Sequence, residues 1–306
     1  MKIILLFAVL SLNLFSLEIK DRTSTSVRIE YDKIKGSEFN LFESKNGKDF
    51  DNNSKIVEIK NGELSKLKAE TYYKLSYNGK EISFWTLAEE PKNVKTNISF
   101  KKAQAKGIKL LTSYMDIADG GILIATLGIK IDLPVDGRTY PVGSFGDESC
   151  RIGSSYVVGY FNPKKDINLN NLKYGIYKFA LIPFNGKGET INYYTDKPKI
   201  RETHPQLPIP VQKECEYFKE NVAEIKWEKV EGAKYYEITV CEDKNCNSIM
   251  LEYNSANVSN GLDWKLFLDD EQKKYYWKIK AVGLYNSSEY NELMEIDYYY
   301  INSAKK

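Results

Sequence analysis

The chain has 306 residues, enough for two or three domains of ordinary size. Its 28% charged and 42% hydrophobic residues form a globular mixture and exclude wholesale disorder. The 44 basic and 42 acidic side chains give a net charge of +2, without the basic excess of a nucleic-acid-binding protein. A single histidine excludes His-rich metal sites and disfavours histidine catalysis, while 23 tyrosines favour a β-rich chain. We therefore expect no enzyme and no cofactor.

The first 16 residues have the pattern of a secretory signal peptide. Lys2 precedes an apolar stretch at 3–15, which ends at the small residue Ser16. The alternative is an uncleaved membrane anchor, but a spanning helix needs about 20 apolar residues. We expect cleavage after Ser16 and a mature chain without a transmembrane segment, secreted across the cytoplasmic membrane. Its destination would be the periplasm, the cell surface or the medium.

Alternation of apolar and polar residues dominates the rest of the chain. Val27, Ile29 and Tyr31 alternate with polar residues, and the same pattern recurs at 223–227, 236–240 and 275–281. Such runs predict half-buried strands. Asn-Gly or Asp-Gly pairs mark turns at 46–47, 61–62, 78–79, 136–137 and 185–186. Many short strands with almost no helical periodicity predict an all-β chain of antiparallel sandwiches.

Two proline-containing segments divide the chain into units. Residues 87–93 contain charged side chains on both sides of Pro91. Residues 203–210 contain three prolines, and this density favours a semi-rigid extended spacer. We expect units at 17–90, 94–201 and 211–303, with the spacer at 202–210. Each unit has a leucine several residues before a tyrosine that opens a strand. These tyrosines are Tyr73, Tyr177 and Tyr275, and their recurrence predicts a tandem array.

The third unit resembles a fibronectin type III domain, a member of the immunoglobulin-like β-sandwiches. The segment from Trp227 to Tyr236 matches the family's strand B, a Gly-Ala turn and strand C, and residues 275–281 match strand F. The resemblance implies that Trp227 and Trp277 lie in the core. It also implies a tyrosine corner, in which the buried strand-F tyrosine, here Tyr275, bonds the backbone of the preceding corner. Tyr73 and Tyr177 would take this role in their own units.

The other two units match the family less closely. The middle unit resembles a variant found in secreted bacterial proteins, in which a Gly-containing excursion follows strand C, here at 134–153. The first unit is short and lacks the strand-B tryptophan, so we expect it to be atypical or incomplete. Taken together, the chain is predicted to be a series of tandem fibronectin type III-like sandwiches.

The long excursion of the middle unit is the predicted binding loop. Long loops on a rigid scaffold are where binding residues usually lie. The residues proposed for this surface are Asp136, Gly137, Arg138, Tyr140 and Phe145. The alternative is that the excursion has a structural role only. A second predicted contact surface is an aromatic strip of Tyr72, Tyr276 and residues 298–300, with ordinary cross-strand pairing as its alternative.

Cysteine and histidine positions complete the sequence-level predictions. Cys241 and Cys246 have the spacing of strand positions that flank a short turn, where a disulfide would add about 2 kcal/mol; two free thiols are the alternative. The sequence does not pair Cys150 with Cys215. His204 lies in the proline spacer and is expected to be solvated. No metal ligand set is expected, and the acidic residues near Asp119 are interpreted as a turn.

The function expected from the sequence is that of a secreted, non-enzymatic binding or scaffold protein of the cell envelope or surface, including adhesion. Its partner would be another protein or a polysaccharide. The alternative is an accessory carbohydrate-binding component of a polysaccharide-processing system. That alternative predicts exposed aromatic side chains for sugar stacking, with Trp85 and Trp264 as candidates.

Overall fold

A computed structural model describes residues 17–31, 38–44, 46–92, 94–101, 105–114, 118–162, 165–218, 222–255, 263–267 and 274–296. The predicted signal peptide and residues 298–300 lie outside this part, as do the side chains of Cys215 and Trp264. Within it the chain is almost entirely β-structure. The two helices described there, η1 (Glu148–Cys150) and η2 (Gly188–Thr190), are single 3-10 turns. Neither is long or apolar enough to cross a membrane.

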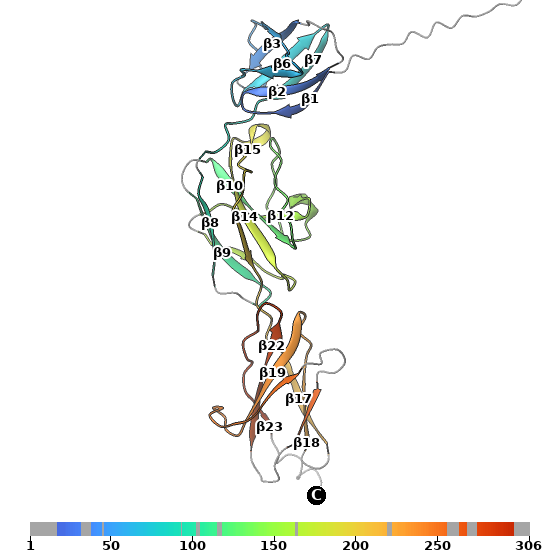
Figure 1. Ribbon diagram of the computed structural model, residues 1–306, viewed down its shortest axis with the longest axis vertical. Helices are drawn as coiled ribbons and strands as arrows, with labels where there is room; N and C mark the ends of the chain where they lie inside the picture. Colours follow the sequence, from blue (N-terminus) through green and yellow to red (C-terminus); the bar gives the residue numbers. More distant parts are fainter. Residues whose placement is uncertain are drawn as a thin grey trace, which may run out of the picture.

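Three β-sandwiches follow one another end to end (Figure 1). The first packs a sheet with strand order β1-β2-β5 against a sheet with order β4-β3-β6-β7. Every strand pair in it is antiparallel. The strands are β1 (Leu17–Arg22), β2 (Ser26–Tyr31), β3 (Glu38–Ser44), β4 (Lys55–Glu58), β5 (Glu63–Ser65), β6 (Tyr72–Tyr77) and β7 (Lys80–Trp85).

The third sandwich repeats this connectivity. Its sheets have the orders β17-β18-β21 and β20-β19-β22-β23. The strands are β17 (Gln212–Phe218), β18 (Val222–Trp227), β19 (Ala233–Cys241), β20 (Ile249–Ser255), β21 (Asp263–Phe267), β22 (Tyr275–Gly283) and β23 (Met294–Ile296). Lettered in chain order, both sandwiches place A-B-E against C′-C-F-G, the strand order of a fibronectin type III fold. The first unit, which the sequence left open as atypical or incomplete, contains all seven strands.

The second sandwich has the same plan with an insertion. Its smaller sheet has the order β13-β9-β8, and its larger sheet has the order β11-β12-β10-β14-β15, with β16 also paired to β14. The strands are β8 (Thr96–Phe100), β9 (Ile108–Tyr114), β10 (Gly120–Leu127), β11 (Arg151–Ile152), β12 (Ser155–Tyr160), β13 (Ile167–Leu169), β14 (Tyr177–Asn185), β15 (Asn192–Tyr193) and β16 (Ile200–Thr203). The inserted residues 128–154 lie between strands C (β10) and C′ (β12). Because β16 ends at Thr203, the sandwich extends two residues past the predicted boundary at 201.

The larger sheet of the second sandwich is buried on both faces. Residues 121–126 of β10 are all buried, whereas a strand with one wet face would alternate. Leu123 belongs to a core shared with the smaller sheet, and Ile124 belongs to a second core on the opposite face. Tyr140 and Cys150 from the insertion complete that second core. The insertion therefore forms a third layer over this sheet.

The tyrosines that open strand F lie where the resemblance implies. The Tyr73 hydroxyl accepts a hydrogen bond from the backbone N–H of Lys68 at 3.0 Å. The Tyr177 hydroxyl donates to the carbonyl of Lys173 at 3.1 Å. Tyr275 is buried at the start of β22, but its corner lies outside the described residues. Burial raises the pKa of Tyr73 and of Tyr177, so both hydroxyls stay protonated.

The Tyr73 hydroxyl should stabilise the first sandwich measurably. We expect Tyr73→Phe to lower the free energy of unfolding of this sandwich by about 1 kcal/mol, because the part-buried backbone N–H of Lys68 loses its acceptor. Tyr72→Phe is the matched control: its side chain lies on the other face of β6, and its recorded contacts are with aromatic rings. Hydrogen exchange of the β6 amides in the full chain measures both. Equal effects of the two substitutions would contradict the corner role.

Candidate functional site

Two of the five residues predicted to bind in this loop are covered, although most of residues 134–153 are exposed. Tyr140 is 4% exposed. The ring of Phe145 contacts Tyr156 and Tyr177, with centroids 5.4 and 5.0 Å apart. The expectation of an exposed binding residue was therefore wrong for Tyr140, and Phe145 is half-buried. The physical reason is that the apolar outer face of β10 must be shielded from water, and the insertion supplies that cover.

Asp136, Gly137 and Arg138 lie at the joint between the first and second sandwiches. The Asp136 carboxylate accepts a hydrogen bond from the backbone N–H of Tyr193 at 2.7 Å, and the Tyr193 hydroxyl donates to the Arg138 carbonyl at 3.1 Å. Gly137 has a positive φ of 72°, and a Cβ there would meet Arg22 of the first sandwich. These residues therefore contribute to a contact between modules.

The first joint is closed by hydrogen bonds to the linker backbone. Ala88 is 2% exposed, and its N–H donates to the Thr190 carbonyl at 2.7 Å. The Asn192 side-chain amide donates to the Ala88 carbonyl, also at 2.7 Å. One residue further on, the Asn185 amide donates to the Glu89 carbonyl at 2.9 Å. The second sandwich thus supplies hydrogen-bond partners for the backbone of Ala88 and for the carbonyl of Glu89. These bonds fix the path of the linker.

The second joint is built around one tyrosine. Tyr174 lies in the loop between β13 and β14 of the second sandwich, and its ring packs against the core of the third. Its hydroxyl accepts a hydrogen bond from the Tyr285 N–H at 3.1 Å. A Cβ on Gly232 or Gly283 would lie 2.3 Å from this ring or its hydroxyl, so both positions need glycine for the close approach.

The proline spacer is fixed to both neighbouring sandwiches. Gln206 forms an isolated parallel bridge with Ala105 of the second, and Leu207 is buried in the core of the third. His204 is not the solvated side chain expected from the sequence. Its Nε2 lies 3.0 Å from the carbonyl oxygen of Tyr285, so that nitrogen donates, and its ring contacts the Tyr285 ring. The Asn286 amide also donates to the Pro205 carbonyl at 2.8 Å.

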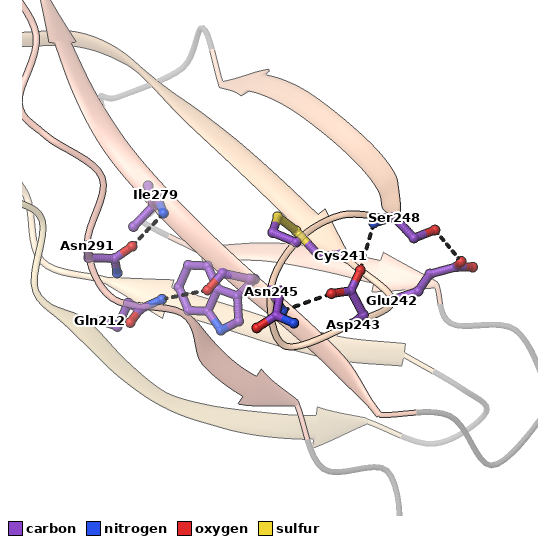
Figure 2. The surroundings of a disulfide bond; sticks show 10 residues. Gln212, Cys241, Glu242, Asp243, Asn245, Ser248, Ile279 and Asn291 are labelled. Atoms are coloured by element: carbon purple, nitrogen blue, oxygen red, sulfur yellow. Dashed lines mark hydrogen bonds between the residues drawn. A yellow bond between two sulfur atoms is a disulfide. The ribbon is translucent and has the colours of Figure 1, made fainter.

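Cys241 and Cys246 form a disulfide in the third sandwich (Figure 2). Cys241 ends β19, but Cys246 lies within the turn, so the bond closes the turn itself and does not join two facing strand positions. The Asp243 carboxylate accepts from the backbone N–H groups of Asn245 and Ser248 at 2.8 and 2.7 Å. These bonds lower the pKa of Asp243. Cys150 is a buried free thiol.

An aromatic group lies on the outer face of the larger sheet of the first sandwich. The ring of Tyr72 contacts those of Trp85 and Phe50, with centroids 5.0 and 5.5 Å apart. The Lys74 ammonium lies 4.8 Å from the Phe42 ring and 5.0 Å from the Phe50 ring. All five side chains are half-buried. The predicted strip of Tyr72 and Tyr276 is not continuous, because the two belong to different sandwiches.

The first joint also carries excess negative charge. Although Asp136 as a whole is exposed, its carboxylate is directed at the buried backbone of Tyr193, and burial raises its pKa. Burial raises the pKa of Glu90 as well, and the charges of Asp136 and Asp196 add to the rise. Within the described part of the chain, no group of three or more His, Cys, Asp or Glu side chains is arranged to hold a metal ion.

No protein-family model matches the sequence, and no curated protein matches it. Among solved structures, the chain is similar to a two-domain fibronectin type III segment of chicken tenascin. The sequence identity is 12% and the TM-score is 0.43, and the match covers 66% of this chain and 97% of the other. It is also similar to the FN1–FN3 domains of chicken CNTN1, at 12% identity and a TM-score of 0.26, covering 92% of this chain and 96% of that one. The assignment of the fold rests on the strand order described above.

Acidification should stabilise the second sandwich through Asp136. The pKa of Asp136 in the folded chain is raised above the unfolded value of about 3.9. Between these two pKa values the folded state binds more protons than the unfolded state. The free energy of unfolding therefore falls as the pH rises through this window. Asp136→Asn keeps the acceptor oxygen and removes the charge. We expect it to be at least as stable as the natural chain at pH 7, with the difference shrinking toward pH 4. Urea unfolding of both proteins across this range measures it, and a gap that widens on acidification would contradict the assignment.

Proposed function

We propose that the chain is a secreted, non-enzymatic scaffold of the cell envelope or surface that holds binding surfaces at fixed spacing. The observation that carries this proposal is the closure of both joints. At the first, the second sandwich bonds the linker backbone at Ala88 and Glu89. At the second, Tyr174 inserts its ring between turns of the third. A chain of independently moving binding modules would not need such contacts.

The partner in this proposal is a protein or a polysaccharide, and adhesion is one use of such a scaffold. Weak contacts gain strength when they are repeated along a rigid array that matches the spacing of sites on its partner. The second candidate function is an accessory carbohydrate-binding component of a polysaccharide-processing system. Its candidate Trp85 is half-buried and tilted by 44° against Tyr72, so this ring lacks the full exposure that sugar stacking favours.

The fixed spacing can be tested by loosening each joint separately. We expect Asn192→Ala, which leaves the Ala88 carbonyl without its side-chain donor, and Tyr174→Ala, which removes the inserted ring, to let the adjoining sandwiches tumble separately. Losing the donor to a buried carbonyl costs about 1–3 kcal/mol. Nitrogen-15 relaxation of the full chain reports a rotational correlation time for each sandwich. Ser76→Ala, on an outer sheet face, is the control. Independent tumbling of the sandwiches in the natural chain would overturn the proposal.

Secretion makes a separate prediction about the mature N-terminus. Expressed in a bacterium with its first 16 residues, the chain should be recovered outside the cytoplasm and should begin at Leu17, because cleavage is expected after Ser16. N-terminal sequencing or intact mass of the recovered protein measures this. A charge placed in the apolar stretch, Leu6→Arg, is the control and should keep the chain in the cytoplasm. Retention of the unaltered chain with Met1 intact would contradict secretion.

A further inference from the structure

The outer face of the smaller sheet of the first sandwich contains a polar hollow. Its volume is about 300 Å³, at the lower end of the range for small-molecule pockets. Charged and polar side chains from β1, β2, β5 and the turns beside them line it. They are Asp21, Thr23, Ser26, Arg28, Asn61 and Glu63. It lies on the opposite side of the sandwich from the aromatic group around Trp85.

The strand register brings the charged members of this set together. Asp21 of β1 pairs with Arg28 of β2, and Arg28 pairs in turn with Glu63 of β5, so the three side chains share one face. The register between β1 and β2 shifts between Ile19 and Asp21, a bulge that increases the local twist. Asn61, with a positive φ of 54°, lies in the turn before β5 and lines the hollow.

The charges around the hollow are near one another but are not joined. Arg28 lies between two carboxylates, yet among the described residues no ion pair or hydrogen bond links its guanidinium to either of them or to another group. Lys20, on the same sheet, behaves differently: its ammonium lies 2.7 Å from both Glu18 and Glu30. The hollow therefore presents donors and acceptors across a gap that no side chain fills.

The chemistry of this lining selects the class of ligand. The lining has one guanidinium and two carboxylates, so any simple ion would meet a like charge beside the opposite one, and an apolar ligand would find no apolar side chain to pack on. A sugar hydroxyl both donates and accepts, so it can accept from the guanidinium while it donates to a carboxylate. The vicinal hydroxyls of a saccharide match the fork of an arginine and the two oxygens of a carboxylate.

We propose that this hollow binds a neutral saccharide of one or two rings. The inference deepens the binding role proposed above and rests on it, since it names a ligand class and a place for one of the scaffold's contacts. Without an aromatic ring in the lining, affinity for one saccharide is expected to be weak. Repetition on a polysaccharide or along several chains would raise it.

Titration of the nitrogen-15-labelled full chain tests the proposal. The probes are glucose, galactose, mannose, N-acetylglucosamine and the disaccharides cellobiose and maltose, each added separately. We expect at least one of them to shift the amide resonances of residues 21–28 and 61–63 in a saturable manner. Arg28→Lys keeps the charge but loses the planar fork, and Glu63→Ala removes an acceptor. Each should weaken binding at least tenfold.

Two control variants separate this site from its neighbours. Lys20→Gln changes a charge on the same sheet outside the hollow and should leave saccharide binding unchanged. Trp85→Ala alters the aromatic group on the opposite face and should also leave it unchanged. Binding that survives Arg28→Lys but is lost in Trp85→Ala would place the saccharide on the aromatic group and overturn the proposal.

Two further outcomes would overturn it. One is the absence of any shift with all six saccharides at high concentration. The other is a shift of the same residues by sodium acetate or lysine as large as that produced by a saccharide, which would show that the hollow responds to charge alone. The relaxation measurement of joint rigidity does not depend on any of these results. A failed titration therefore leaves the scaffold role standing, and independent tumbling leaves the saccharide site standing.

Discussion

A tyrosine hydroxyl at the corner before strand F is the interaction on which the arrangement of the first two sandwiches depends. In the first, the Tyr73 hydroxyl holds the backbone of Lys68, whose carbonyl in turn accepts from Thr86 at the start of the linker. In the second, the Tyr177 hydroxyl holds Lys173, the residue before Tyr174. A hydrogen bond inside each sandwich therefore fixes its corner, and the residues next to that corner contact the linker or the next sandwich. Because each corner is fixed within its own sandwich, the contacts beside it hold the neighbouring sandwich in a defined orientation.

Close backbone approach is the second requirement of both joints. The Tyr174 ring occupies the space that side chains at Gly232 and Gly283 would fill. At the first joint, a Cβ on Gly186 would lie 2.8 Å from the Ala88 side chain. Both joints thus bring the end of one sandwich against glycine-containing turns of the next. A single added methyl at these turns would clash with the neighbouring sandwich or the linker.

Alternation along the strands was sufficient to predict the sandwiches, because one face of each such strand packs on the core and the other faces water. A structural role of the excursion was left open as the alternative, and β10 carries a signal that favours it. Its residues 121–126 are apolar or small without alternation, the pattern of a strand buried on both faces. His204 was misjudged for a different reason. Its partner Tyr285 lies 81 residues away, and no local pattern indicates a contact between two separately folded units.

The joints also determine which surfaces remain for recognition. Loops at the ends of a sandwich are the usual binding positions on such scaffolds. Here end loops of the second sandwich are already engaged: Asn185 bonds the Glu89 carbonyl of the linker on one side, and Tyr174 enters the third sandwich on the other. Rigidity and loop-based recognition therefore compete for the same residues. The sheet faces of the first sandwich stay outside both joints, and they carry the aromatic group around Trp85 and the polar hollow around Arg28.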